Sequence, residues 1–140
     1  MKRAENNTFD ALINAEKLLQ GILDVVNTHP DEASREFGSA SINIMLNDYD
    51  AALEHMKNVI AMKPNVSFYY RRLAEILVLQ DEWKEALPHL ERVMELESQD
   101  TAAANLLLAT YQKTENREKA KKLEEYLDAH KNFLKALNQD

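Results

Sequence analysis

The chain has 140 residues, a net charge of −7 and no cysteine. This length allows one domain with a sizeable core, and the lack of cysteine excludes a disulfide framework and thiolate chemistry. The acidic charge argues against nucleic acid or an anionic membrane as the main partner. No apolar run reaches the ~20 residues that cross a bilayer, and the basic residues at the N-terminus precede no apolar segment. We therefore expect no signal peptide and a cytoplasmic location.

Residues 1–30 are predicted to contain an extra N-terminal helix, which Asn7 or Thr8 can cap and which His29-Pro30 ends. Its apolar residues recur at helical spacing over a broad face: Phe9, Leu12, Ile13, Ala15, Leu18, Leu19, Ile22, Leu23, Val25 and Val26. A face this broad needs cover on more than one side. Two interpretations remain open: a helix that caps the first repeat, or an exchangeable segment that plugs a groove or forms a dimer contact.

The rest of the chain repeats one pattern every 34 residues, in segments 33–66, 67–100 and 101–134. Three alanines mark equivalent positions in the three segments: Ala52, Ala86 and Ala120. A fixed period of this length indicates stacked structural units, and arrays of this kind usually bind other proteins. Each unit holds two helical patterns that are separated by a short polar turn.

The predicted helix boundaries follow from capping residues and breaks. The second helix of each unit should begin near Tyr49, Trp83 and Arg117. Short polar side chains that can accept bonds from free N–H groups are the expected N-caps of these helices: Asp48, Asp81 and Asn116. Pro64 ends the first unit, because proline cannot continue a helix. The expected N-caps of the next first helices are Asn65 and then Asp100 or Thr101.

Apolar residues at helical spacing predict the buried side of the second helices in units one and two: Leu53, Met56, Val59 and Ile60, then Leu87, Leu90, Val93 and Met94. Half of this stripe is charged in the third unit, as expected of a last repeat whose outer face meets water. The final helix is predicted over roughly 117–137, with its second half covering the end of the stack. Pro88, inside the second helix of unit two, is expected to kink that helix.

The 34-residue helix–turn–helix unit resembles the tetratricopeptide repeat. The matching residues are the three alanines, Ala40 and Ala74 in the first helices, Tyr49 and Trp83 at the turns, Pro64 at the end of a unit, and the large first-helix residues Tyr70, Leu73 and Tyr111. The resemblance covers about residues 33–134. It implies an all-α, right-handed superhelical stack of antiparallel helix hairpins in a single domain over 1–140, with the extra N-terminal helix and an extended C-terminal capping helix.

The first helix of unit one departs from the family pattern. Glu36, Ser39 and Asn43 replace the large apolar residues that the family carries there, and Phe37, Ala40 and Ile44 form the stripe that remains. We therefore expect this helix to pack loosely, or against residues 9–26.

The resemblance also implies that the first helices line a concave groove that binds a peptide or a helical segment of a partner protein. The groove positions are Phe37, Ser41 and Met45 in unit one, Phe68, Arg71, Arg72, Glu75 and Leu79 in unit two, and Asn105, Ala109 and Gln112 in unit three. Such a surface suits a segment with apolar anchors and an acidic residue. Adjacent arginines do not face the same way on a helix, so Arg71 is the expected ligand contact. Alternatively, Phe68 and Leu79 are core residues and the arginines pair with carboxylates of this chain.

Other functions find little support. The clamp with which some family members hold the C-terminal carboxylate of heat-shock chaperones does not match, because its positions hold Phe37, Ser41, Arg72, Ala102 and Leu106. Glu85 and His89 share a helix face but lack a third metal ligand. We expect no cofactor, no metal and no enzymatic activity.

The predicted function is therefore that of an adaptor, scaffold or chaperone. The alternatives are a homodimeric assembly subunit that associates through the N-terminal helix, a bacterial secretion chaperone, and an accessory domain of a longer chain.

Overall fold

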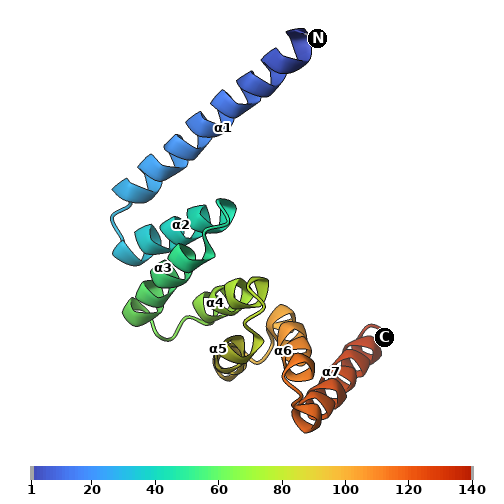
Figure 1. Cartoon of the computed structure of the whole chain (residues 1–140). Helices are drawn as coiled ribbons and strands as arrows, with labels where there is room; N and C mark the ends of the chain where they lie inside the picture. Colours follow the sequence, from blue (N-terminus) through green and yellow to red (C-terminus); the bar gives the residue numbers. More distant parts are fainter. Residues whose placement is uncertain (1, 140) are drawn as a thin grey trace. The chain divides into compact units, whose positions relative to one another are not determined.

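The structure is a computed structural model that describes the backbone of residues 2–139 and the side chains of residues 8–139. Over this range it contains seven α-helices and no strand (Figure 1), which confirms the all-α prediction. The helices are α1 (Lys2–Thr28), α2 (Glu32–Met45), α3 (Tyr49–Met62), α4 (Ser67–Leu79), α5 (Trp83–Leu96), α6 (Thr101–Lys113) and α7 (Arg117–Leu137). No helix in the described range is long and apolar enough to cross a membrane.

The second helices begin at the predicted residues Tyr49, Trp83 and Arg117, and the last one ends at Leu137 as predicted. The chain divides into two compact parts, Met1–Lys63 and Pro64–Asp140. We call them the first unit and the second unit; the second contains repeats two and three.

In the first unit, α2 packs along α3. The C-terminal end of α1 contacts α2, where Val26 lies against Gly38. The core consists of Ala33, Ala40, Ile42, Ala52, Met56 and Val59. Glu36, which replaces an apolar residue of the family pattern, hydrogen-bonds across to α3: the Nδ1 of His55 lies 2.6 Å from its Oε2. Thus α2 packs against both neighbours, and a polar bond occupies the place of a larger apolar contact.

In the second unit, α4, α5, α6 and α7 pack in sequence, each helix against the next. Its core residues include Leu73, Ala74, Ile76, Leu77, Ala86, Leu90, Val93, Ala103, Ala104, Leu107 and Tyr111. Ala86 is fully buried, as is its counterpart Ala52, so the close helix approach that small residues predict is present in both units. α5 runs unbroken through Pro88.

The three turns within the hairpins share one backbone geometry at the 34-residue spacing. Asn47, Asp81 and Glu115 have positive φ angles of 57°, 62° and 62°. The N–H of each following residue donates to the carbonyl five residues back, at 2.8 Å in all three turns: Asp48 to Asn43, Glu82 to Leu77 and Asn116 to Tyr111. This is the bond of a Schellman motif, which satisfies carbonyls at the end of the preceding helix.

This geometry corrects one predicted cap. Asp81 is not the N-cap of α5, because it occupies the left-handed turn position and Glu82 is the N-cap. Asp48 caps α3 as predicted by accepting from the N–H of Ala51. Asn116 stands at the N-cap of α7, but its side chain donates to the Thr114 hydroxyl instead.

Two other capping predictions are wrong. α1 begins at Lys2, so neither Asn7 nor Thr8 caps it; the preceding Lys, Arg, Ala and Glu are good helix formers and extend the helix. Val66 rather than Asn65 stands at the N-cap of α4, and it makes no side-chain cap bond. Asp100 caps α6 as predicted, accepting from the N–H of Ala103 at 3.0 Å.

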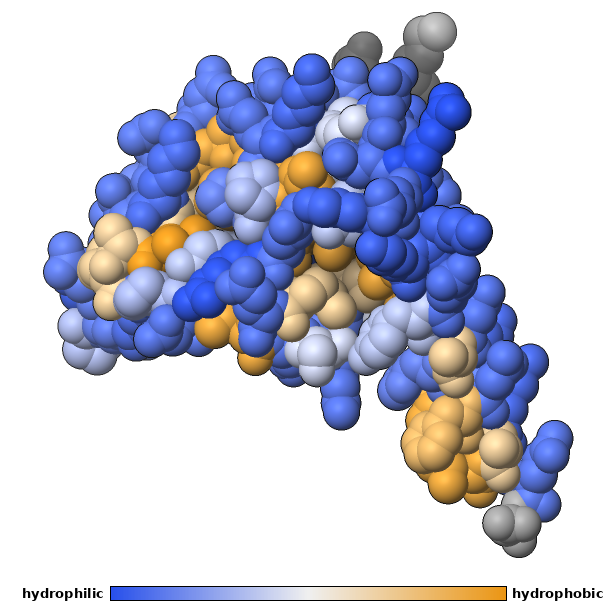
Figure 2. All heavy atoms as spheres, turned by 90° about the horizontal axis from the view of Figure 1, so that it is seen from below, coloured by the Kyte–Doolittle hydropathy of each residue, from blue (hydrophilic) through white to orange (hydrophobic). Residues whose placement is uncertain are grey.

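The second half of α7 does not cover the end of the stack. Leu127 is the last half-buried residue of the helix, and every described residue after it is exposed. The reason is length: α7 has 21 residues and α6 only 13, so at about 1.5 Å per residue α7 extends roughly 12 Å further than its packing partner. Figure 2 shows the resulting block of hydrophobic surface near the C-terminus, at the lower right, and it is built by Phe133, Leu134 and Leu137.

Candidate functional site

An exposed aromatic side chain with two cations lies on α4. The guanidinium carbons of Arg71 and Arg72 are 5.5 and 5.6 Å from the ring centroid of Phe68, which is within cation–π range. The two arginines are adjacent in sequence, yet their long side chains reach the same ring. Phe68 itself remains 39% exposed, so it is not a core residue.

Two carboxylates complete this arrangement. Glu75 lies 3.1 Å from Arg72 and 4.0 Å from the Nε of Arg71, and Asp100 lies 3.4 Å from the Nη1 of Arg71. Asp100 also caps α6, so Arg71 connects α4 to the start of α6. The Arg71 Nε is buried and has no hydrogen-bond partner among the described residues. We call Phe68, Arg71, Arg72, Glu75 and Asp100 the Phe68 cluster.

The two arginines of the Phe68 cluster differ in what they present to solvent. The side chain of Arg71 is 25% exposed and that of Arg72 is 46% exposed. Arg71 is therefore held mainly by contacts within the chain, whereas Arg72 presents more of its side chain to solvent beside Phe68. An exposed ion pair such as Arg72–Glu75 is worth about 0.2–1 kcal/mol, so a carboxylate of a partner could replace Glu75 at low cost.

The structure brings together four of the predicted groove residues in the Phe68 cluster and adds Asp100, which sequence reasoning treated as a cap alone. On the same unit Leu79, Asn105 and Gln112 are exposed, and Ala109 is half-buried. Gln112 donates to Glu124 at 3.3 Å.

The remaining groove predictions lie on α2, in the first unit. Phe37 and Ser41 are half-buried, and Met45 is exposed. The Ser41 hydroxyl donates to the carbonyl of Phe37 at 3.0 Å, which is a bond within the helix. These three residues lie on one helix of unit one, outside the Phe68 cluster.

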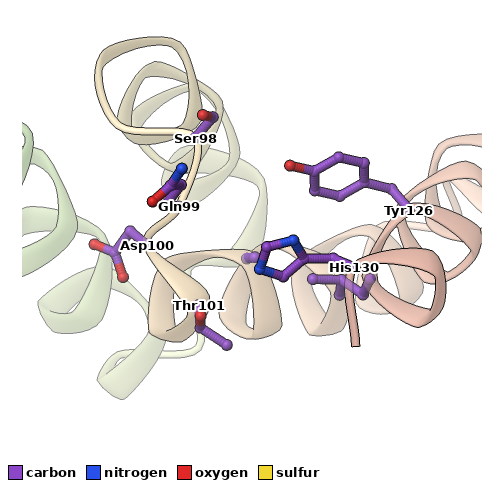
Figure 3. A pocket seen from close by; sticks show the side chains of 8 residues that line it. Ser98, Gln99, Asp100, Thr101, Tyr126 and His130 are labelled. Atoms are coloured by element: carbon purple, nitrogen blue, oxygen red, sulfur yellow. The ribbon is translucent and has the colours of Figure 1, made fainter. Parts of the chain in front are cut away.

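A small cavity lies between the loop before α6 and the middle of α7. Figure 3 shows Tyr126 and His130 of α7 facing the loop segment 98–101. The Tyr126 and His130 rings stack with centroids 6.4 Å apart. The cavity volume is ≈ 20 Å³, which is enough for about one water molecule and too small for a ligand. No group of three His, Asp or Glu side chains capable of holding a metal ion occurs within the described residues.

Comparison with known proteins finds one family that matches part of the chain. The sequence profile of the tetratricopeptide repeat matches residues 44–109. No curated protein sequence matches the chain significantly.

Solved structures of MamA proteins are similar. A crystal structure of MamA superposes with a TM-score of 0.70 at 18% identity, covering 84% of this chain and 69% of that one. The MamA RS-1 ArsTM double mutant gives 0.67 at 23%, covering 85% and 68%. MamA 41-end from Desulfovibrio magneticus RS-1 gives 0.67 at 23%, covering 87% and 70%. The TM-scores show that the fold is shared, and at identities of 18–23% the similarity shows the fold alone. Residues 44–109 of this chain therefore belong to the tetratricopeptide repeat family, and the structural matches extend its fold over most of the chain.

Proposed function

We propose that this chain is a protein-interaction module, an adaptor or scaffold, that binds a segment of a partner protein at the Phe68 cluster. The observation that carries the proposal is the exposed Phe68 ring with two guanidinium groups beside it. The tetratricopeptide repeats support the class of function, because such arrays bind other proteins.

The geometry favours a partner segment with an apolar side chain and a nearby carboxylate. The apolar side chain would pack on Phe68, and the carboxylate would pair with Arg72, the more exposed arginine. Arg71 would act indirectly, since Asp100 and Glu75 hold it in place. Aromatic residues and arginine are the residue types that most often dominate binding energy at protein interfaces.

The test is a pull-down from native lysate with the wild-type chain and a Phe68→Ala, Arg72→Glu variant. Lys84→Glu is the matched control, because it makes the same charge change at an exposed site on α5. The bound segment of a captured protein is then made as a synthetic peptide and titrated calorimetrically. We expect the variant to lose the partner and to bind the peptide at least ten-fold more weakly, while the control binds like wild type. Equal binding by all three would exclude the Phe68 cluster as the site.

A client-holding chaperone role would use the same surface and is distinguished by its effect on the client. A chaperone would keep the identified client soluble when the two are mixed in stoichiometric amounts, whereas an adaptor would bind it without changing its aggregation. Light scattering of the client during heating, with and without the chain, separates the two roles.

A homodimeric assembly subunit is the second candidate function, favoured by the apolar side chains exposed along α1: Phe9, Leu12, Leu18 and Val25. It predicts a stable dimer that Ile22→Glu abolishes in multi-angle light scattering. A monomeric wild-type chain would contradict it.

A further inference from the structure

A groove of ≈ 450 Å³ lies between α6 and α7. Its apolar walls are Leu108 of α6 and Leu127 and Leu134 of α7. The α7 wall extends from Glu124 to Leu134, which is about 15 Å of helix, or roughly three turns. His130 lines both this groove and the small cavity of Figure 3. The groove shares no lining residue with the Phe68 cluster, so it is a separate surface.

The repeat indicates that the group which fits this face is a helix. Val93 of α5 is the counterpart of Leu127 one repeat earlier. Val93 is fully buried, and α6 packs against α5. A helix laid along the second helix of a hairpin is therefore the arrangement that the fold already uses at the equivalent position.

The groove differs from that equivalent face in charge. Glu124 and Asp128 stand where α5 has the apolar residues Leu90 and Met94, and Lys131 lies one turn further along α7 than Asp128. A wholly apolar helix face would cover two carboxylates and an ammonium group without a compensating charge, which is costly. A helix that carries both a base and an acid beside its apolar stripe matches the order of charges along this wall.

We propose that the α6/α7 groove binds an amphipathic helix of another protein, in which one base pairs with Asp128 and one acid pairs with Lys131. Apolar side chains of that helix pack on Leu108, Leu127 and Leu134, as in other complexes where a helix lies in a groove. The groove and the Phe68 cluster are separate, so the chain can hold two partner segments at once, as a scaffold does. The proposal does not rest on the Phe68 cluster.

The test titrates labelled, hydrocarbon-stapled helical peptides with the chain and follows fluorescence anisotropy. The staple is needed because isolated helices of about 15 residues are only marginally stable in water. Three peptides share one leucine stripe and differ at two flanking positions one turn apart. The dipolar peptide carries a lysine and a glutamate there, the acidic peptide two glutamates, and the basic peptide two lysines. We expect the dipolar peptide to bind about five-fold more tightly than either of the others.

Variants with altered charge separate this site from general attraction to the acidic chain. Asp128→Lys makes both flanking positions of the groove cationic and should make the acidic peptide the tightest ligand. Lys131→Glu makes both anionic and should make the basic peptide the tightest. Glu16→Lys on α1 and Lys84→Glu on α5 make the same charge changes at exposed residues that do not line the groove, and should keep the wild-type order.

Leu134→Ala tests the apolar wall without adding charge. Leu134 is exposed and alanine favours helix, so circular dichroism should show unchanged helicity. The dipolar peptide should bind this variant about five-fold more weakly. Leu137→Ala is the matched control, because Leu137 is exposed on the same helix and does not line the groove. The Phe68→Ala, Arg72→Glu variant should bind the dipolar peptide like wild type.

Three results would overturn the proposal. Equal binding of the three peptides, or no binding of any, would exclude a helix site with this charge order. An order of affinities that stays the same in Asp128→Lys would show that the peptides bind elsewhere. Tighter binding of a stapled peptide with the sequence of residues 8–28 than of the dipolar peptide would make α1 of a second copy the occupant, in place of another protein.

Discussion

Gly38 of α2 lies against Val26 of α1 so closely that a Cβ atom on the glycine would be 2.6 Å from one valine methyl carbon and 2.9 Å from the other. Within a helix, glycine costs about 1 kcal/mol relative to alanine. The close approach of the two helices offsets that cost. Gly21 of α1 provides the comparison, because no atom lies within 4 Å of the corresponding Cβ position.

Gly38→Ala should therefore destabilise the first unit although alanine is the better helix former. Valine is stiff at χ1 and cannot turn away freely, and overpacking of this kind costs about 1–3 kcal/mol. Gly21→Ala should instead stabilise the chain by up to about 1 kcal/mol. Urea unfolding followed by circular dichroism checks both. The added Val26→Ala should rescue Gly38→Ala; lack of rescue would show that another contact is responsible.

The bond between Glu36 and His55 predicts a pH dependence of stability. The hydrogen bond from His55 lowers the pKa of Glu36 below its ordinary value of 4.5, against the opposing effect of burial. Because the carboxyl pKa is depressed in the folded state, its stabilisation is present above pH 4.5 and is lost as the pH falls through the folded value. Urea midpoints between pH 3 and 7 should fall more steeply toward acid for wild type than for Glu36→Gln. Parallel profiles would contradict this role.

Ala86 sets the approach of α4 and α5. Its side chain is fully buried, so Ala86→Leu should cost about 1–3 kcal/mol through overpacking. Ala102→Leu on the exposed side of α6 is the control and should change stability by less than about 0.5 kcal/mol. Thermal unfolding of both variants gives the comparison. An unchanged midpoint for Ala86→Leu would mean that the two helices do not meet there.

The ion pair between Arg71 and Asp100 should couple α4 to the start of α6. The two residues are 29 positions apart, and their side chains are 25% and 13% exposed. A double-mutant cycle with Arg71→Met and Asp100→Asn should give a coupling free energy of about 0.5 kcal/mol or more in urea unfolding. Asn retains the capping ability of Asp, so loss of the cap does not confound the cycle. Strict additivity of the two single changes would show that the pair contributes nothing.

The candidate site could be predicted from the sequence only in part. Phe68, Arg71, Arg72 and Glu75 share a short stretch of one helix, so helical spacing was enough to group them. The sequence predicts Asp100 as a cap, because capping depends only on the three residues that follow it. Its contact with Arg71 requires α5 to pack antiparallel to α4, so that the loop after α5 lies beside the start of α4. No local sequence pattern predicts that contact.

The helix caps show how far local sequence predicts a helix boundary. The predicted Asp81 cap was wrong by one residue, although Asn47, Asp81 and Glu115 stand 34 residues apart and share a positive φ. Asp48, Glu82 and Asn116 are also 34 residues apart, so the period alone indicates Glu82 as the cap, whereas the better capping chemistry of aspartate favours Asp81.

By itself the sequence determined the repeat, the starts of the second helices and the small residues at helix contacts, because these depend on local propensity and on a period visible along the chain. Only the tertiary structure decided which apolar faces are covered. The apolar stripes on α1 and on the end of α7 have the spacing of buried helix faces in the sequence, yet Val25 and Phe133 are exposed. Apolar periodicity shows that a face can be buried, and burial itself requires another helix within reach.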